Sequence, residues 1–232
     1  MLNFYTGEIL LFDKPREWSS FDVVNKTRIL IKIKFGKKLK VGHAGTLDPL
    51  ATGLLILCTG KKTKEISEFS GLDKEYIATI AFGNTTPSYD LETEPDKFYK
   101  TEQITEDKLI EALKTFEGKQ MQTPPIFSAK KINGEKAYIN ARLGKEVEVR
   151  QQEIDIKEIE VLDANLPHEV KIRMVVSKGT YIRSFAHDLG QKLNSGAYLK
   201  NLIRTKIGNF DLKNAYSLED FEKVVQETEI EL

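Results

Sequence analysis

Apolar and polar residues alternate with a period of two in several short segments, which is typical of strands with one buried face. In the segment KEYIATIAF, for example, every second residue from Tyr76 to Phe82 falls on one face. Other short apolar runs end at turn-forming residues such as Asp13-Lys14-Pro15. The predicted strands are residues 7–12, 54–58, 74–82 and 170–176.

Other segments repeat their apolar residues at helical spacing. Ser19 or Ser20 can cap a first helix, with Phe21, Val24, Ile31 and Phe35 near one face. Gly118 is expected to end a second helix, which covers residues 105–117. The predicted helices cover residues 20–35, 105–117 and 181–193, and a last one starts near Ser217 with Asp220 at its third position.

Strands and helices follow each other irregularly, and hairpins could join neighbouring strands. This order predicts an α+β fold with a mixed, largely antiparallel sheet flanked by helices. We expect one domain over residues 1–232, with an acidic helical tail at 213–232. Residues 122–150 are polar, contain proline and are rich in Lys, Arg and Gly, so we expect an insertion that projects from the core.

Composition narrows the classes of function. No apolar run is long enough to cross a membrane, and the first residues lack the layout of a signal peptide. The single cysteine, Cys58, excludes an intrachain disulfide and fits a buried thiol in a reducing cytoplasm. With one cysteine and three scattered histidines, no metal-ligand spacing emerges, so we expect no metal site. We also expect a cytoplasmic protein that does not bind membranes.

Charge is unevenly distributed although the formal net charge is zero. Residues 1–66 hold twelve Lys and Arg against six Asp and Glu, and residues 177–213 hold seven against two. Two basic regions on a neutral chain suit a phosphate-rich ligand that must bind and then leave. Ordinary surface charge explains the same distribution equally well.

The stretch from Gly42 to Gly53 (GHAGTLDPLATG) combines glycines and small residues with one carboxylate, Asp48, and one imidazole, His43. Glycine permits close backbone approach, and Pro49 restrains Asp48 to extended conformations. Such a loop can hold a side chain in a fixed pose beside a ligand. Taken alone, an Asp before Pro is more often a turn former, and His43 a plain loop residue.

This loop resembles the catalytic motif of the bacterial tRNA pseudouridine-55 synthase (TruB) family, with an unbroken match from His43 to Leu55. Further matches follow in the order of that family and extend the resemblance over about residues 7–212. They are Asp13-Lys14-Pro15, Lys74-Glu75-Tyr76, Pro124-Pro125, Phe127-Ser128-Ala129, Asn133-Gly134, Lys178-Gly179-Thr180-Tyr181-Ile182-Arg183-Ser184, His187-Asp188-Leu189-Gly190 and Leu202-Ile203-Arg204-Thr205.

The resemblance implies an isomerase that breaks the N1–C1′ bond of a uridine, rotates the base and joins C5 to C1′, without cofactor or metal. Asp48 is then the catalytic carboxylate, as a nucleophile or as a base. Arg183 matches the arginine that keeps this carboxylate ionised; a surface ion pair is the plainer reading. Tyr76 matches the tyrosine that packs on the flipped base, although a strand residue can also serve the core.

Other residues match positions in the same pocket or on its RNA. Tyr181 matches a second aromatic and Leu202 an apolar lining residue, and either could instead be core. His43 matches a residue that fills space vacated in the RNA loop. Asp90 matches an acid that contacts nearby flipped bases. The candidates for phosphate contact with the T-arm of tRNA are Lys14, Lys61, Lys62, Lys64, Lys130, Lys131 and Arg142.

The chain also departs from the family pattern. Glu17 and Thr93 stand where relatives usually have glycine. These departures put in doubt the conformation of the loop around Asp90 and the role of Asp90, but not the role of Asp48. Many relatives carry a C-terminal RNA-binding (PUA) domain, whereas about 24 residues follow the last motif here. We therefore expect a short form, monomeric, whose binding to tRNA is unusually sensitive to salt.

Other functions compete with uridine isomerisation. A tRNA-binding or tRNA-folding chaperone needs the same basic surfaces, but the intact set of Asp48, Tyr76 and Arg183 argues against lapsed catalysis. A guide-RNA-dependent synthase of rRNA shares the core but depends on an extra domain and protein partners. A glycosidase would need a second catalytic acid, for which the sequence offers no convincing candidate.

Overall fold

The computed structural model describes residues 3–127, 131–132, 135–136 and 150–229. Its chain divides into two compact units, Met1–Tyr76 with Ile203–Leu232, and Ile77–Leu202. We call them unit 1 and unit 2. Two strands, β4 (Lys74–Phe82) and β12 (Ala197–Ile207), contribute residues to both units. That the whole chain is one domain stays a prediction.

The centre of unit 1 is strand β3 (Thr52–Thr59), in which every residue after Thr52 is buried. Strand β1 (Ile9–Lys14) pairs with it antiparallel, from Ile9 opposite Cys58 to Lys14 opposite Gly53. The short β2 (Val41–His43) is also antiparallel to β3, and the end of β12 runs parallel to it. Strand β13 (Phe210–Asp211) closes a hairpin with β12. Its central residues, Leu54 to Cys58, are all apolar and all buried, which is typical of a strand that is covered on both faces.

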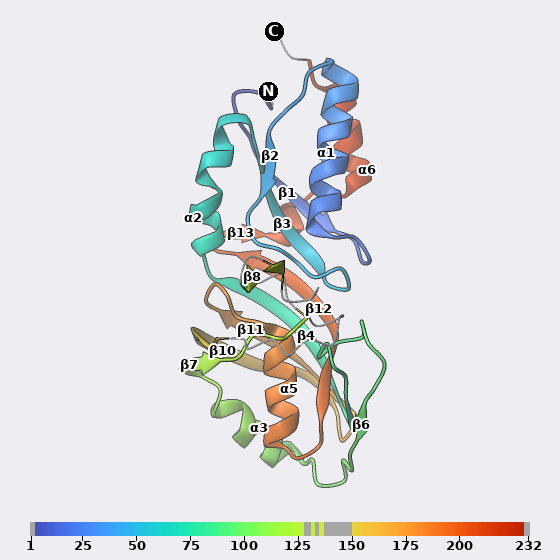
Figure 1. The fold of residues 1–232 in the computed structure, drawn as a ribbon, viewed down its shortest axis with the longest axis vertical. Coiled ribbons are helices and arrows are strands. Elements are labelled where there is room, and N and C mark those ends of the chain that lie inside the picture. Colours follow the sequence, from blue (N-terminus) through green and yellow to red (C-terminus); the bar gives the residue numbers. More distant parts are fainter. Residues whose placement is uncertain (1–2, 128–130, 133–134, 137–149, 230–232) are drawn as a thin grey trace. The chain divides into compact units, whose positions relative to one another are not determined.

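Two helices of unit 1 lie side by side, α1 (Ser20–Phe35) and α6 (Leu218–Glu227) (Figure 1). Ser19 caps α1 in a reciprocal box with Asp22, and Ser217 caps α6 by accepting from the Asp220 amide, as predicted. Their apolar faces meet the Phe12 side of β1, where the rings of Phe12 and Phe221 lie 4.8 Å apart. Of the predicted face, Val24 and Ile31 are buried, but the prediction for Phe21 was wrong, because it is 56% exposed. Val23 and Leu30 join the buried face.

Shorter helices complete unit 1. The 3₁₀ helix η1 (Gly60–Glu65) leads into α2 (Ile66–Gly71), and the 3₁₀ helix η2 (Leu212–Asn214) follows β13. Cys58 lies in the core beside Ala44 and Ile56, as predicted for a buried thiol. Burial, followed by the charge of Glu65, raises the pKa of this thiol to about 11, which keeps it protonated and unreactive at neutral pH.

In unit 2 the strand order is β4, β11 (Glu169–Val176), β10 (Gln152–Asn165) and β7 (Gly118–Gln122). Both β11 and β7 pair antiparallel with β10. Helices α3 (Glu106–Lys114) and α5 (Ile182–Lys192) lie side by side (Figure 1), with the rings of Phe116 and Phe185 5.0 Å apart. A two-stranded ladder, β5 (Asn84–Thr85) with β6 (Lys97–Phe98), stands apart from this sheet.

These pairings confirm the predicted α+β class with its mostly antiparallel sheet. The long β10 escaped prediction because its register with β11 shifts twice, which interrupts the period of two. Of the predicted insertion at 122–150, the structure describes the hairpin of β8 (Lys131–Ile132) and β9 (Glu135–Lys136) and the flanking residues. The rest, with Lys130 and Arg142, lies outside the described residues.

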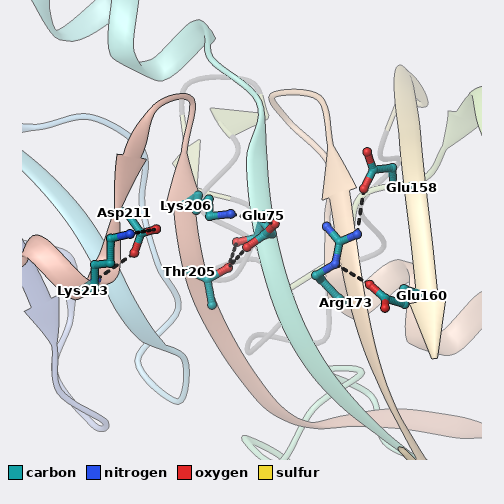
Figure 2. A network of polar contacts seen from close by, with 8 residues as sticks. All are labelled: Glu75, Glu158, Glu160, Arg173, Thr205, Lys206, Asp211 and Lys213. Atoms are coloured by element: carbon teal, nitrogen blue, oxygen red, sulfur yellow. Dashed lines mark hydrogen bonds and ion pairs between the residues drawn. The ribbon is translucent and has the colours of Figure 1, made fainter. Parts of the chain in front are cut away.

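Polar pairs span neighbouring strands in each unit (Figure 2). In unit 2, Arg173 of β11 donates from Nε to Glu160 at 2.7 Å and from a terminal nitrogen to Glu158 at 2.8 Å. In unit 1, Glu75 of β4 accepts from the Thr205 hydroxyl at 2.7 Å and pairs with Lys206 at 3.4 Å. Glu75 thereby ties the start of β4, next to Tyr76, to the end of β12.

Candidate active site: the loop of Asp48 and the pair of Arg183

The loop that carries Asp48 joins β2 to β3 in unit 1. Both of its ends are fixed by the antiparallel pairing of those strands, and Ala44 donates to the Ile56 carbonyl at 2.9 Å. Gly45 and Gly53 have φ values of +93° and +103°, which favour glycine. At Gly53 a Cβ would lie 2.4 Å from the Arg204 carbonyl oxygen, so the loop meets β12 too closely for any side chain.

Arg204 is the largest polar anchor of this loop. Its side chain is almost fully buried at 1% exposure. The guanidinium donates to three carbonyl oxygens, those of Leu54 at 2.7 Å, Gly45 at 3.1 Å and Thr46 at 3.4 Å. A guanidinium offers five donors in a rigid fork, so one side chain fixes the backbone on both sides of Asp48.

Lys14 anchors the loop from β1 and is fully buried. Its ammonium donates to the carbonyl oxygens of Trp18 at 2.6 Å, Pro15 at 2.8 Å and Pro49 at 3.3 Å. Its donors are therefore used inside unit 1, and the phosphate contact expected from the sequence does not fit this position. Burial is the largest cause that lowers the pKa of Lys14 to about 8. The negative charge of Asp48 raises this pKa in part, and the positive charge of Arg204 lowers it further.

Two further contacts define the turn around Asp48. The Ser20 hydroxyl, at the start of α1, accepts from the Leu47 amide at 2.8 Å and donates to the Leu47 carbonyl at 3.2 Å. The Glu17 amide donates to the Pro49 carbonyl at 2.8 Å, with Glu17 at φ +69°. That left-handed backbone explains why glycine suits this position in the family pattern.

Asp48 itself is half-buried on this braced turn, and its carbonyl accepts from the Ala51 amide at 3.1 Å. His43 ends β2 on the approach to the loop and is also half-buried. Burial and then the charge of Arg204 lower the pKa of His43, so its imidazole is neutral at pH 7. A neutral ring fits the predicted role of stacking or hydrogen bonding without titration. Tyr76 is 8% exposed and directly follows Glu75 in β4.

Arg183 belongs to unit 2, on the first turn of α5, and is buried. Its Nε lies 3.7 Å from Oδ2 of Asp90, and a terminal nitrogen donates to the Ser88 carbonyl at 3.2 Å. Asp90 is buried as well, at 5% exposure. The structure thus brings two predicted site residues together, and sequence reasoning had not paired them. The predicted pairing of Arg183 with Asp48 stays a prediction.

Tyr181 and Leu202 are also residues of unit 2. Tyr181 is half-buried just before α5, where its backbone amide donates to Oε1 of Gln122 at 2.8 Å and its carbonyl accepts from the same side-chain amide at 3.0 Å. This clamp fixes the entry to the helix that carries Arg183. Leu202 is buried in β12. Their predicted contacts with a base remain predictions.

The lysines predicted to contact phosphate differ in their surroundings. Lys61 and Lys64 on η1 are exposed. Lys62 pairs with Glu65 at 2.9 Å, and this hydrogen bond raises its pKa. The backbone of Lys131 lies in β8, and the structure does not describe its side chain. Of the lysines expected to contact phosphate, Lys61 and Lys64 are therefore the strongest candidates.

Sequence reasoning missed the bracing roles of Arg204, Lys14 and Ser20. A signal was available for Arg204, because the motif Leu202-Ile203-Arg204-Thr205 places an arginine at an inward position of an apolar strand. A buried Arg or Lys is uncommon unless its donors are satisfied. Among the described residues, no group of three or more His, Cys, Asp or Glu could hold a metal. In the same part of the chain, no helix has both the length and the apolar character that crossing a membrane requires.

Comparisons with known proteins agree over the whole chain. Residues 30–182 match the N-terminal domain model of the TruB family pseudouridylate synthases, and residues 183–231 match a tRNA pseudouridylate synthase B C-terminal domain. The chain is 55% identical over 231 residues to a tRNA pseudouridine synthase B of Phocaeicola vulgatus, covering 99% of this chain and 98% of that one. It is 53% identical over 222 residues to the one of Flavobacterium johnsoniae, covering 95% and 96%.

Solved structures share the fold. A Cbf5-Nop10-Gar1 complex matches with a TM-score of 0.69 and 29% identity, covering 95% of this chain and 54% of that chain. An H/ACA RNP bound to a substrate RNA matches with a TM-score of 0.66 and 27% identity, covering 95% and 53%. The chain thus spans about half the length of these two solved chains. With the braced aspartate loop and matches along the whole sequence, the chain belongs to the TruB family of pseudouridine synthases.

Proposed function

We propose that this protein isomerises uridine 55 in the T-loop of tRNA to pseudouridine, with Asp48 as the catalytic carboxylate. The observation that carries the proposal is the bracing of Asp48's turn by Arg204, Lys14 and Ser20. Full-length relatives at about half identity that are named tRNA pseudouridine synthase B support the choice of tRNA. The guide-dependent alternative is disfavoured, because the similarity to the H/ACA complexes is weaker and covers half of those chains.

The reaction is balanced without an external reagent. The N1–C1′ bond breaks, the uracil rotates while held in the site, C5 joins C1′, and the proton lost from C5 is matched by the proton that N1 gains. Asp48 acts as a nucleophile on the sugar or base, or as a base at C2′. In either role it must be ionised, and the positive charge of Lys14 favours that state. Preorganisation by fixed hydrogen bonds lowers the barrier because the loop does not reorganise during reaction.

The remaining site residues take the roles implied by the family. We propose that Arg183 keeps Asp48 ionised and that Tyr76 and Tyr181 sandwich the flipped base, with Leu202 beside them. His43 fills space vacated in the T-loop, and Asp90 faces neighbouring flipped bases. Lys61 and Lys64, both exposed on η1, contact backbone phosphates of the T-arm. The enzyme works as a monomer and without cofactor.

The test is release of tritium from tRNA that carries 5-tritiated uridine. The wild type is expected to release it, and Asp48→Asn should lower the rate on the order of 10³-fold or more, because a reacting group is lost. Asp107→Asn, which alters an exposed carboxylate on α3, is the matched control and should keep the wild-type rate.

Binding and mass separate the other functions. Asp48→Asn should still bind tRNA, because its phosphate contacts are intact. If the wild type binds tRNA but releases no tritium, a chaperone replaces the enzyme. Isomerisation leaves the mass of the RNA unchanged, whereas a glycosidase would remove the mass of a base.

A further inference from the structure

We propose that the stacked rings of Tyr89 and His187 position the Arg183 guanidinium by locking the loop that holds Asp90. The inference rests on the proposed function, in which Arg183 serves the catalytic aspartate. It assigns Tyr89 and His187 as positioning residues that act through Asp90 and Arg183. All of the contacts that carry it lie within unit 2.

Loop 86–93 presents two acceptors to Arg183 from either side of Tyr89. The Ser88 carbonyl accepts from a terminal guanidinium nitrogen at 3.2 Å, and Oδ2 of Asp90 lies 3.7 Å from Nε. The other carboxylate oxygen of Asp90 accepts from the Glu92 amide at 2.9 Å, which orients the carboxylate. The residue between the two acceptors therefore sets where both of them point.

The backbone of Tyr89 is held in an unfavourable conformation. Its φ is +63°, in the left-handed region that non-glycine residues seldom adopt. Its amide donates to the Thr86 carbonyl at 3.1 Å, and its carbonyl accepts from the Leu199 amide of β12 at 2.9 Å. Such a conformation persists where its surroundings hold it, and strained residues of this kind cluster at functional sites.

The ring of Tyr89 supplies the link to the helix of Arg183. It stacks on His187 with the centroids 4.0 Å apart and the planes 17° from parallel. His187 lies four residues after Arg183 on α5, so both project from the same face of that helix. Burial is the largest cause of the lowered pKa of His187, so the ring is neutral at pH 7. Loop 86–93 thus contacts two successive turns of α5, at Arg183 and at His187.

Thr93, at the position where relatives usually have glycine, adds hydrogen bonds within loop 86–93. Its hydroxyl accepts from the Ser88 amide at 3.1 Å and shares a second hydrogen bond with the Ser88 hydroxyl at 2.8 Å. The Thr86 hydroxyl donates to the Asp90 carbonyl at 2.7 Å. This departure from the family pattern therefore adds contacts that close the loop.

The experiment compares Tyr89→Ala with Tyr89→Phe in single-turnover and steady-state tritium release. Tyr89→Ala should lower kcat about ten-fold while KM changes less than about two-fold, because positioning of a group in the transition state is lost. Tyr89→Phe keeps the stacking ring and should restore wild-type kcat. His187→Ala and His187→Phe form a second, independent pair with the same expectation. Thermal melting checks that each variant is folded.

A double-mutant cycle shows whether Tyr89 acts through the ion pair. In an Asp90→Asn background, Tyr89→Ala should lower kcat by less than about two-fold further, because the partner that it positions is already changed. Wild-type kcat in folded Tyr89→Ala or His187→Ala, or full additivity in the cycle, would overturn the inference.

Nuclear magnetic resonance separates this inference from the proposed function. In protein labelled with ¹⁵N-arginine, the Nε–H signal of Arg183, assigned with Arg183→Lys, should be protected from solvent exchange in the wild type and in Tyr89→Phe. It should lose protection in Tyr89→Ala. If the wild type fails to isomerise uridine but shows this pattern, the proposed function is wrong, whereas the inference that Tyr89 and His187 position Arg183 is supported. Unchanged protection in Tyr89→Ala contradicts this inference whatever the activity.

Discussion

Two loops of this protein hold charged residues by different means, loop 42–53 in unit 1 and loop 86–93 in unit 2. The first is braced by buried cations from distant parts of the chain: Lys14 lies 35 residues before Pro49, and Arg204 lies 159 residues after Gly45. The second is closed mainly by hydroxyl groups within five residues of their partners and by one pair of stacked rings.

The difference teaches how each loop depends on the rest of its unit. Loop 42–53 has its conformation only when β1 and β12 have taken their places beside β3. Loop 86–93 can form much of its turn from local contacts, and then needs α5 to orient it. Changes to the first loop should therefore cost folding stability, whereas changes to the second should mainly cost precision in the site.

The largest effect is expected for Arg204→Met. The variant leaves the carbonyl oxygens of Gly45, Thr46 and Leu54 without their donor in a buried place. An unsatisfied buried polar group costs about 1–3 kcal/mol, so the free energy of unfolding should fall by about 3–5 kcal/mol. Urea unfolding followed by circular dichroism measures it. Arg204→Lys, which keeps a charge and part of the donor set, should lose less. Equal stability of Arg204→Met and wild type would contradict the bracing role.

Lys14→Met should lower catalysis in addition to folding stability. It removes three donated hydrogen bonds and the positive charge that interacts with Asp48. Misplacement of a catalytic group by a fraction of an ångström to 1 Å can cost up to about 10²-fold, so we expect kcat to fall about 10- to 100-fold. Single-turnover tritium release measures it. Lys61→Met, at an exposed lysine of η1, is the control and should alter KM before kcat.

The pH dependence follows from the pKa of Lys14. With a folded-state pKa of about 8 against an ordinary value of 10.5, the ammonium loses its proton earlier in the folded protein than in the unfolded one. Between these values the unfolded state binds more protons, so Lys14 contributes rising stability as the pH increases. Activity should move the opposite way, with an alkaline limb near pH 8 as the charge beside Asp48 disappears. Lys14→Arg should remove this limb, and its persistence there would assign the limb to another group.

Much of the fold could be predicted because its signals are local. Ser19 with Asp22 and Ser217 with Asp220 mark helix starts within four residues, and the alternation of residues 74–82 coincides with β4. The long β10 could not be predicted in the same way, because its register with β11 shifts twice and none of its residues after Ile156 is buried.

The residues of the candidate site also divide into those with a local signal in the sequence and those without one. The glycine-rich loop and its Asp48 stand together in the sequence, so both were predicted. The interior places of Lys14 and Arg204 were not, because charged residues are usually exposed and their carbonyl partners are brought near only by sheet pairing. The pair of Arg183 and Asp90 joins residues far apart in the chain, and the sequence offers no local sign of it.

A smaller effect is expected for Thr93→Val in loop 86–93. Valine keeps the shape of threonine but loses the hydroxyl that bonds the Ser88 amide and hydroxyl. A hydrogen bond contributes about 0.5–1.5 kcal/mol net, so the free energy of unfolding should fall by about 1 kcal/mol. Ser20→Ala is the matched change at loop 42–53, where one hydroxyl bonds both the amide and the carbonyl of Leu47. If Thr93→Val destabilises more than Arg204→Met, the contrast between the two loops is wrong.

The smallest effect is expected for Glu17→Gly, beside loop 42–53. Glu17 has φ +69°, and a left-handed backbone costs a residue with a Cβ about 1–2 kcal/mol. Glycine relieves this strain but gains about 0.4–1 kcal/mol of freedom in the unfolded chain, so the net change should be a stabilisation of about 0.5 kcal/mol. The amide bond from residue 17 to the Pro49 carbonyl is kept in both proteins.

Glu17→Ala is the control, because alanine removes the carboxylate but keeps the Cβ and its strain. We expect its stability to stay within about 0.5 kcal/mol of the wild type, as for surface substitutions generally, and the glycine variant to exceed it in urea unfolding. Were the two variants equally stable, the positive φ would carry no strain at this position. The turn at Pro49 would then be held by its hydrogen bonds alone, and the cost of replacing glycine at this point of the family pattern would have to lie elsewhere.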